Sequence, residues 1–325
     1  MLVRPDLSAL AHRVGPGVLT RYAPSPTGYL HLGHVVNAVY VWGVAGALGG
    51  RVLLRIEDHD RIRCRAEYEA ALLEDLEWLG FTDHGPAEAG HYVPPHPGRA
   101  GHYVPPRPGE AGHYVRQSDQ PAVYEEALAG LRQQHHVYAC DCSRKEIGGE
   151  RYGGACRARN LDDRSHRGVR VEIGLGVERF EDALLGAQEQ EPADQCGDLL
   201  LRDRDGHWTY QFAVAVDDQR QGVGLVIRGA DLLTSTGRQI RLARMLGRQQ
   251  PAVFLHHPLV LNASGERAGE KLSKSAGDTS VRDLRAAGLS PAEVIGRAAA
   301  AAGLIDSRQP IPASEVSELF RSRTV

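Results

Sequence analysis

Residues Arg21–His34 read RYAPSPTGYLHLGH, and this stretch guides the interpretation of the chain on either side of it. The apolar residues Val18–Thr20 in front of it predict a short strand, and its own prolines and glycines prevent regular structure in its middle. Val35–Trp42 is apolar nearly all round, as a buried helix would be, and Val52–Ile56 predicts a second strand. The order strand, rigid turn, helix, strand is that of a βαβ unit.

The turn carries two histidines at the entrance of the predicted helix. His31 and His34 lie where the free N–H groups and the positive end of the helix dipole attract phosphate. Gly33 between them lets the backbone approach a ligand closely. Because an HxGH pattern alone is more often two ordinary histidines, a phosphate site needs support from a second motif.

The second motif is the segment 271–275, KLSKS. The chain has only three lysines, and two of them, Lys271 and Lys274, fall in this segment while arginine supplies nearly all other positive charge. Because arginine is used almost everywhere else, the two lysines in this segment indicate a need for a compact ammonium group. Gly265 and Gly269 predict that the segment is a mobile loop. We expect both lysines to be catalytic and to close on phosphate groups.

Composition narrows the class of protein. A chain of 325 residues suits one large or two modest domains with an ample core. The net charge of −3 gives no overall basic field for non-specific nucleic-acid binding, although a local RNA-binding face remains compatible with it. The sequence contains no transmembrane span and opens with no signal peptide. Five cysteines, three of them clustered, argue against a disulfide scaffold, so we expect the reducing cytoplasm.

Charged residues follow the second predicted strand in the run RIEDHDR, residues 55–61. Carboxylates just past the carboxyl end of a parallel strand lie where an α/β sheet usually holds its ligand. Taken alone, the same run would be interpreted as a solvated charged turn. It becomes a candidate ligand-binding segment only together with the two motifs above.

An 11-residue tandem repeat, AGHYVPPHPGR, begins at Ala89, is nearly repeated from Ala100 and starts a third time at Ala111. Its Pro-Pro pairs favour extended polyproline geometry and block helix formation. Three copies of His-Tyr could form a metal or RNA patch. The simpler interpretation, which we favour, is a duplication inside a flexible and dispensable surface loop.

Three cysteines, Cys140, Cys142 and Cys156, are separated by a glycine-rich link. A Cys-x-Cys pair with a third cysteine can wrap a tetrahedral zinc ion, but one ligand is then missing. The nearby candidates for it are Tyr152, His135, His136, His166 and Cys196. The alternative is that the three cysteines are unmetallated small hydrophobes.

The remaining helices and strands are predicted from hydrophobic periodicity and from residues that typically begin or end helices. Helices are expected at 67–79, 121–134 and about 236–246, and strands at 169–171, 199–201, 225–229 and 253–255. Periodicity does not decide between helix and strand for 208–218. Residues 1–17 are interpreted as an N-terminal extension of little consequence. The tail from residue 280 is helical, with Ser290 as an N-cap and Pro291 at the first helical position.

Together these motifs resemble the class I aminoacyl-tRNA synthetases. HxGH and KLSKS are similar to the HIGH and KMSKS signatures of that class, and Arg21–Gly33, Arg55–Asp58 and Arg228–Asp231 resemble its glutamyl branch in the same order. The cysteine spacing is similar to the zinc site of the glutamyl-Q tRNA(Asp) synthetases, the truncated paralogues in that branch. The resemblance covers most of the chain apart from the N-terminal extension and the repeat.

The resemblance implies a reaction and a set of site residues. L-Glutamate would be joined to the α-phosphate of ATP, accompanied by Mg²⁺, with loss of pyrophosphate. The implied glutamate-binding residues are Arg21, Ser25, Glu57, Tyr210 and Arg228, with Glu57 at the amino group. The implied ATP-binding residues are His31, Gly33, His34 and Lys274. One structural zinc ion would be held by Cys140, Cys142, Tyr152 and Cys156. Two arginines suit a dicarboxylic amino acid, because guanidinium pairs bidentately with carboxylate.

The resemblance also implies which molecule accepts the activated glutamate. Glutamate would be activated without tRNA and transferred to the queuosine base in the anticodon loop of tRNA(Asp), and we expect a monomer. We expect no separate anticodon-binding domain, because the tail leaves no room for one, as in the truncated paralogue. The alternatives are a truncated glutamyl-tRNA synthetase that charges tRNA(Glu), another class I-like nucleotidyl transferase, and a catalytically idle RNA-binding paralogue.

We therefore expect an α/β protein with a class I synthetase-type Rossmann-like nucleotide-binding fold. Residues 1–81 would form the first half of the catalytic domain, and 206–262 the second half. Residues 82–205 would form an inserted small α/β subdomain, acceptor-binding-like, with the repeat at 89–115 and the zinc site. Residues 263–325 would hold the KLSKS loop and a short C-terminal helical region.

Overall fold

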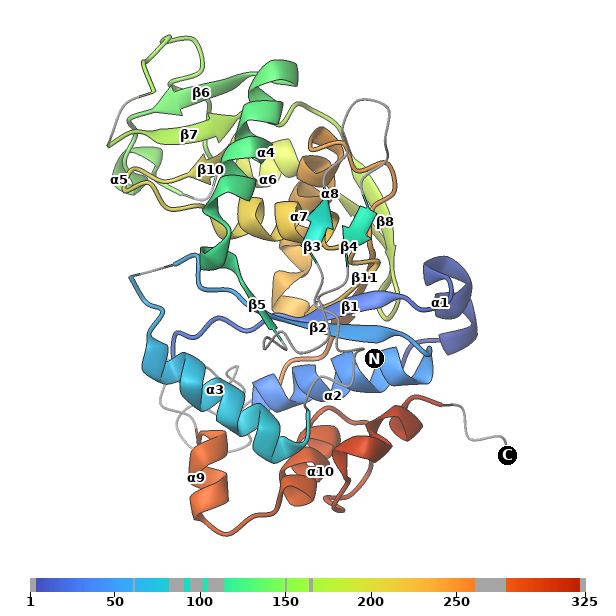
Figure 1. The fold of residues 1–325 in the computed structure, drawn as a ribbon. Coiled ribbons are helices and arrows are strands. Elements are labelled where there is room, and N and C mark those ends of the chain that lie inside the picture. The colour runs from blue at the N-terminus through green and yellow to red at the C-terminus, as the bar shows by residue number, and fades with distance from the viewer. Residues whose placement is uncertain are drawn as a thin grey trace.

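The computed structural model describes residues 4–60, 62–81, 114–149, 151–163, 166–260 and 279–321, together with the backbone of 91–93 and 102–104. The KLSKS segment with Lys271 and Lys274 lies outside the described residues, as do Arg61 and most of the repeat. Figure 1 shows a central sheet with helices beneath it, a smaller α/β body above it and further helices at the opposite end.

Two sets of parallel strands lie side by side at the centre. In one set β1 (Leu19–Tyr22) pairs with β2 (Arg51–Ile56), which pairs with β5 (Tyr114–Arg116). In the other set β11 (Leu225–Gly229) pairs with β12 (Val253–His257). The N–H of Gly224 donates to the Leu19 carbonyl at 2.9 Å and joins the two sets.

A hairpin extends the second set. It consists of β8 (Glu178–Asp182) and β9 (Gly186–Gln190), and β8 runs parallel to β12 with Asp182 opposite Phe254. The hairpin and β5 come from the range 82–205, which the sequence assigns to the inserted subdomain. In the structure both segments pair with strands of the catalytic domain, although the predicted division places them in the inserted subdomain.

The helix after the HxGH turn, α2 (Leu32–Ala47), lies against the sheet and is buried along most of its length. On its other side pack α10 (Pro291–Ala301) and η4 (Ala313–Leu319) (Figure 1). A Cβ atom at Gly43 would lie 2.3 Å from the Phe320 ring, so only glycine permits this approach. The C-terminal region is thus part of the main core. It also contains α9 (Val281–Ala286), near α3 (Ala66–Leu79).

The expectation that residues 1–17 matter little is wrong. They form α1 (Leu7–Val14), capped by the Asp6 carboxylate, which accepts the N–H groups of Ser8 and Ala9. Leu10 is buried in the main core, and Arg4 donates to the carbonyls of Leu304 and Leu319. A short amphipathic helix gains little stability by itself, so its role depends on a docking surface that only the folded chain provides.

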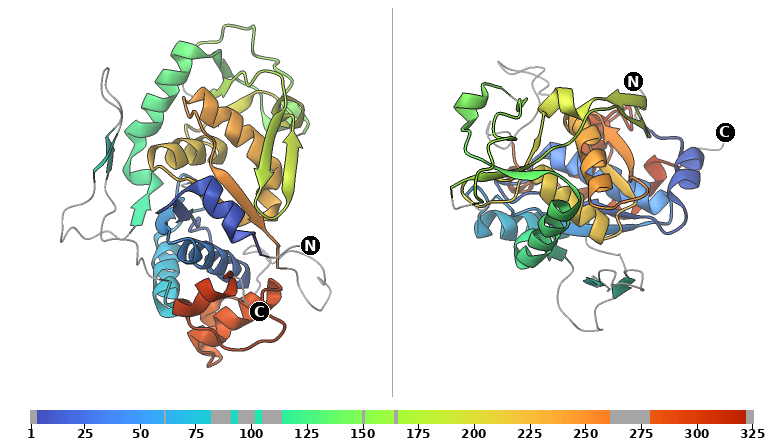
Figure 2. Two further views of the ribbon diagram at one scale, coloured as in Figure 1. Left: turned by 90° about the vertical axis from the view of Figure 1, so that its right-hand side faces the viewer. Right: turned by 90° about the horizontal axis from the view of Figure 1, so that it is seen from above.

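The smaller body contains α4 (Pro121–Gln134), an antiparallel sheet and two short helices. The sheet has the order β10 (Leu199–Arg202), β7 (Gly168–Val171), β6 (Val137–Cys140), and the helices are α5 (Arg144–Ile147) and α6 (Pro192–Cys196). The core of this body includes Phe212 of α7 (Tyr210–Arg220) and Leu242 of α8 (Thr236–Met245). Figure 2 shows both helices beneath the smaller body. The undecided segment 208–218 is therefore mainly helical, and it links the two bodies.

The described part of the repeat forms strands, while the Pro-Pro pairs expected to be extended polyproline lie outside the described residues. His91–Val93 (β3) and His102–Val104 (β4) pair antiparallel with Tyr92 opposite Tyr103, and the third copy supplies β5. Tyr and Val favour strands. Proline follows the triplet in the first two copies and cannot donate to a ladder. Arg116 follows it in the third, which lets β5 continue into η1 (Gln117–Asp119).

Most other elements match the expected ranges. The helix at 121–134 and the strand at 225–229 agree end to end, and the predicted Ser290 cap is present as a capping box with Glu293. Within the described part of the chain, every helix is too short or too polar to cross a membrane.

Candidate active site

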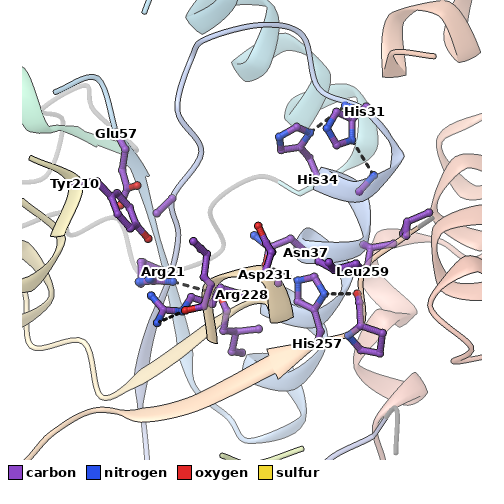
Figure 3. Close-up of a pocket in the computed structure, with 18 residues that line it drawn as sticks. Arg21, His31, His34, Asn37, Glu57, Tyr210, Arg228, Asp231, His257 and Leu259 are labelled. Carbon is purple, nitrogen blue, oxygen red and sulfur yellow. Dashed lines mark hydrogen bonds between the residues drawn. The ribbon is translucent and has the colours of Figure 1, made fainter. Parts of the chain in front are cut away.

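A pocket lies at the carboxyl ends of β1, β2, β11 and β12 (Figure 3). Open α/β sheets bind ligands at this edge. On one side Figure 3 shows Arg21, Glu57, Tyr210 and Arg228, and on the other the entrance of α2. The lining brings together seven residues predicted as site residues: Arg21, His31, Gly33, His34, Glu57, Tyr210 and Arg228.

The two histidines cap the N-terminus of α2 reciprocally. The Nδ1 atom of His31 accepts the N–H of Gly33, and the Nδ1 atom of His34 accepts the N–H of His31, both at 3.1 Å. The two rings lie with centroids 3.9 Å apart. Because each neutral ring accepts at Nδ1, it carries its proton on Nε2 and acts there as a donor. Two such donors beside a helix N-terminus suit an anionic ligand.

A buried ion-pair network holds the first arginine and the carboxylate. Asp218 accepts from Arg21 at 3.2 Å and from Arg55 at 2.7 Å. Arg55 also donates to Glu57 at 2.9 Å and is fully buried. Burial raises the pKa of the Asp218 carboxyl, but Arg21 and Arg55 outweigh that effect and hold it below its ordinary value. Arg55 and Asp218 thus fix the positions of the two pocket residues.

The second arginine, Arg228, is 4% exposed and is held by three side chains. Its guanidinium donates to Gln239 at 2.7 Å, to Thr236 at 2.9 Å and to His256 at 3.0 Å. Burial is the main cause that lowers the pKa of this group. A buried cation kept in one orientation is suited to bind a carboxylate of matching geometry.

Among the described residues predicted to bind glutamate or ATP, Ser25 is absent from the pocket lining. It lies in the turn before α2 and is half-buried. Lys271 and Lys274 lie outside the described residues. The described chain leaves the pocket at Val260, which lines it, and returns at Ser280, which pairs with His31.

Three polar residues of the lining were not predicted as site residues: Asn37, Asp231 and His257. Asn37 follows His34 by three positions, so helical periodicity alone would have placed it on the same face of α2. Its side chain contacts the His257 ring at 3.1 Å. Asp231 and His257 lie at the carboxyl ends of β11 and β12, where the rule for α/β sheets would have identified both as candidates.

A second cluster lies in the smaller body. The sulfur atoms of Cys140, Cys142 and Cys156 lie close enough to share one metal ion, and Cys142 and Cys156 are 3.5 Å apart. The Tyr152 hydroxyl lies 3.5 Å from the Cys140 sulfur and accepts the N–H of Cys156 at 2.8 Å. Ligands at about 2.3 Å from a tetrahedral zinc ion would be about 3.8 Å apart. The three sulfur atoms could therefore hold one metal ion, and the Tyr152 hydroxyl lies beside one of them.

Three of the other candidates for the fourth ligand have other partners, and the remaining one, His166, is not part of the cysteine group. His136 faces Glu172 at 3.1 Å, and His135 faces the Met245 carbonyl at 3.1 Å. The Cys196 thiol donates to the Pro192 carbonyl at 3.1 Å. Among the described candidates, Tyr152 therefore lies best to complete the cysteine cluster.

The fold and the site define an α/β protein with a pocket at the ends of parallel strands, where a histidine-capped helix lies beside two buried arginines. Residues 17–297 match the family described as tRNA synthetases class I (E and Q), catalytic domain. The chain belongs to this family, whose members are ligases that use ATP.

Named relatives agree with this assignment. The chain is 37% identical to a glutamyl-Q tRNA(Asp) synthetase of Symbiobacterium thermophilum, over 92% of this chain and 91% of that protein. It is 36% identical to glutamate–tRNA ligase 2 of Acidithiobacillus ferrooxidans, over 93% of this chain but 63% of that ligase. The fold is similar to that of a glutamate tRNA ligase from Elizabethkingia meningosepticum, with a TM-score of 0.71, 24% identity and coverage of 94% and 65% of the two chains.

Proposed function

We propose that the protein activates L-glutamate with ATP in the absence of tRNA and transfers it to the queuosine base in the anticodon loop of tRNA(Asp). The observation that carries the activation step is the meeting of Arg21, Arg228 and Glu57 in one pocket beside the histidine cap. Support for the acceptor comes from relatives named glutamyl-Q tRNA(Asp) synthetase, which match over nearly their whole length.

Charge favours glutamate as the amino acid. The lining contains two arginines, Arg21 and Arg228, together with carboxylates, and glutamate carries two carboxylates and one ammonium group. Glu57 would accept the ammonium group, and Arg21 and Arg228 would face the carboxylates, with Tyr210 beside them. Arg21 already pairs with Asp218, whereas Arg228 is held by the uncharged side chains of Gln239 and Thr236. A glutamate carboxylate would therefore supply Arg228 with a counter-charge that the amide of glutamine lacks. Ser25 remains a prediction from the resemblance.

Adenylate formation needs positioning and stabilisation of phosphate charge. His31 and His34 would donate from Nε2 to the phosphates, with Gly33 giving close access to the helix N-terminus. Mg²⁺ bound with ATP would offset phosphate charge. Lys271 and Lys274 would reach the same phosphates, because the chain on both sides of their segment lies at this pocket.

Zinc is the metal that suits the cysteine cluster. Three thiolates and a phenol oxygen form a soft tetrahedral set of the kind that structural zinc sites use. Nearby cations would offset the thiolate charge: Arg159 donates to the Cys156 sulfur at 3.5 Å, and the Arg170 guanidinium lies 3.9 Å from the centre of the Tyr152 ring. The ion would tie β6 to the following loop. The five free thiols also support the reducing cytoplasm as the compartment.

The zinc site makes a direct prediction. The purified protein should carry about one zinc ion per chain, and Cys142→Ala should lose it, because a two-thiolate site binds zinc far more weakly. Cys64→Ala is the matched control, since Cys64 lies apart from the cluster. Metal analysis checks both variants. Full zinc occupancy after Cys140, Cys142 and Cys156 have all been replaced by alanine would refute the assignment.

The acceptor is tested in two steps. Glutamate-dependent ATP–pyrophosphate exchange should occur without any tRNA. Labelled glutamate should then appear on tRNA(Asp) that carries queuosine and remain after periodate oxidation of the terminal ribose, whereas tRNA(Asp) lacking queuosine should stay unlabelled. Label on tRNA(Glu) that disappears after periodate would instead identify a ligase of the glutamate–tRNA type. Absence of exchange would support the idle paralogue.

A further inference from the structure

The guanidinium of Arg228 is oriented from behind by two residues that line no part of the pocket. We propose that His256 and Asp182 are positioning residues, a buried carboxylate–imidazole pair that aims Arg228 at a carboxylate of the substrate. This inference rests on the proposed function, because it assigns Arg228 the substrate carboxylate.

The hydrogen bonds define the direction of the pair. The Nε atom of Arg228 lies 3.0 Å from Nε2 of His256, and the Nδ1 atom of the same ring lies 2.6 Å from the Asp182 carboxylate. Guanidinium nitrogens only donate, so Nε2 of His256 must accept. The ring proton is then on Nδ1 and is donated to Asp182. Carboxylate, imidazole and guanidinium thus form one line of hydrogen bonds.

The three hydrogen-bonded residues lie on three adjacent strands. Arg228 of β11 and His256 of β12 are direct partners in the sheet, and Asp182 ends β8 on the other side of β12. The side chains of His256 and Asp182 are both 0% exposed. Asp182 also accepts the backbone N–H groups of Leu184 and Leu185, each at 3.0 Å. The carboxylate is therefore fixed to the backbone of the β8–β9 hairpin.

The remaining contacts of Arg228 leave one direction for a ligand. Gln239 and Thr236 accept from the terminal nitrogens, and the Leu232 carbonyl lies at 3.4 Å. With His256, these contacts occupy four of the five N–H groups of a guanidinium. The side chain also lines the pocket beside Tyr210, with which it shares a side-chain hydrogen bond, so a substrate carboxylate would meet the guanidinium on this side. A guanidinium that lost the Nε contact could turn, and its remaining donor would no longer be aimed.

His256 and Asp182 can orient Arg228 only while the His256 imidazole is neutral. Burial is the main cause that lowers the pKa of His256, and Arg228 and Arg21 lower it further, while Asp182 raises it. The ring is therefore held in the state that can accept from Arg228. Buried charged networks often contribute little net stability compared with apolar residues of the same size. The orientation of Arg228 is a role for this network that a contribution to stability does not explain.

Two substitutions of His256 distinguish the hydrogen bond at Nε2 from the hydrogen bond at Nδ1. A glutamine can place its amide oxygen near the position of Nε2 and accept from Arg228, whereas asparagine reaches only the Nδ1 side. His256→Asn should raise the KM for L-glutamate roughly 10- to 100-fold, as expected when a charged group loses a hydrogen-bond partner. The KM for ATP and the exchange rate at saturating glutamate should stay near the wild-type values. His256→Gln should restore most of the affinity for glutamate.

A matched control is His136→Asn, because His136 also faces a carboxylate, Glu172, but is half-exposed in the smaller body. This variant should keep the wild-type KM. Equal KM values for glutamate in His256→Asn and His256→Gln would overturn the proposal, as would a loss confined to kcat. Wild-type protein without glutamate-dependent exchange would refute the proposed function itself. Wild-type exchange with equal variants would refute only the positioning role.

Discussion

Replacing Arg55 with leucine is expected to lower the free energy of unfolding by about 3–5 kcal/mol. The Arg55 side chain is 0% exposed and pairs with Asp218 at 2.7 Å and with Glu57 at 2.9 Å. Its removal leaves two buried carboxylates near each other without their shared cation. Urea denaturation should show the loss as a lower midpoint with an unchanged m-value.

The matched control is Arg63→Leu. Arg63 pairs with Asp60 at 2.6 Å, but its side chain is 73% exposed, so its loss should cost less than about 1 kcal/mol. Arg55→Leu combined with Glu57→Gln should recover part of the lost stability, because Glu57 loses its pairing with Arg55 whereas Asp218 keeps Arg21 as a partner. An Arg55→Leu protein as stable as the Arg63→Leu control would show that the network adds nothing to the fold.

Replacing Arg228 with alanine is expected to raise the KM for glutamate by two to three orders of magnitude. Truncating one partner of a buried, hydrogen-bonded charge pair costs about 2–5 kcal/mol, and Arg228 is the residue that would face a substrate carboxylate in a buried setting. The KM for ATP should change little, since the phosphates would lie at the α2 side of the pocket. Glutamate-dependent pyrophosphate exchange measures both constants.

Two variants complete this experiment. Arg228→Lys should recover part of the affinity, because it keeps the charge but loses the planar fork. Arg285→Ala removes an arginine that is paired with Glu74 at 2.9 Å outside the pocket lining, and it should leave both KM values unchanged. A rise in the KM for ATP alone would contradict the assignment of Arg228 to glutamate.

The sequence by itself determined the local structure around the motif Arg21–His34. The rigid turn Arg21–His34, the capped helix after it and the strands next to it follow from proline, glycine and apolar runs that act over a few residues. Arg21, Glu57 and Arg228 were predicted from motifs, and the structure brings them into one pocket. Their individual roles in binding glutamate remain predictions.

The tertiary structure alone decided which residues support the pocket. Asp218 joins Arg21 and Arg55 from 197 and 163 residues away in the sequence, and Asp182 meets His256 across 74 residues. These contacts depend on the order and register of the strands, which no local pattern specifies. The helical state of 210–220 was also undecided, because Phe212–Asp218 is buried all round and such a segment has no amphipathic period to read.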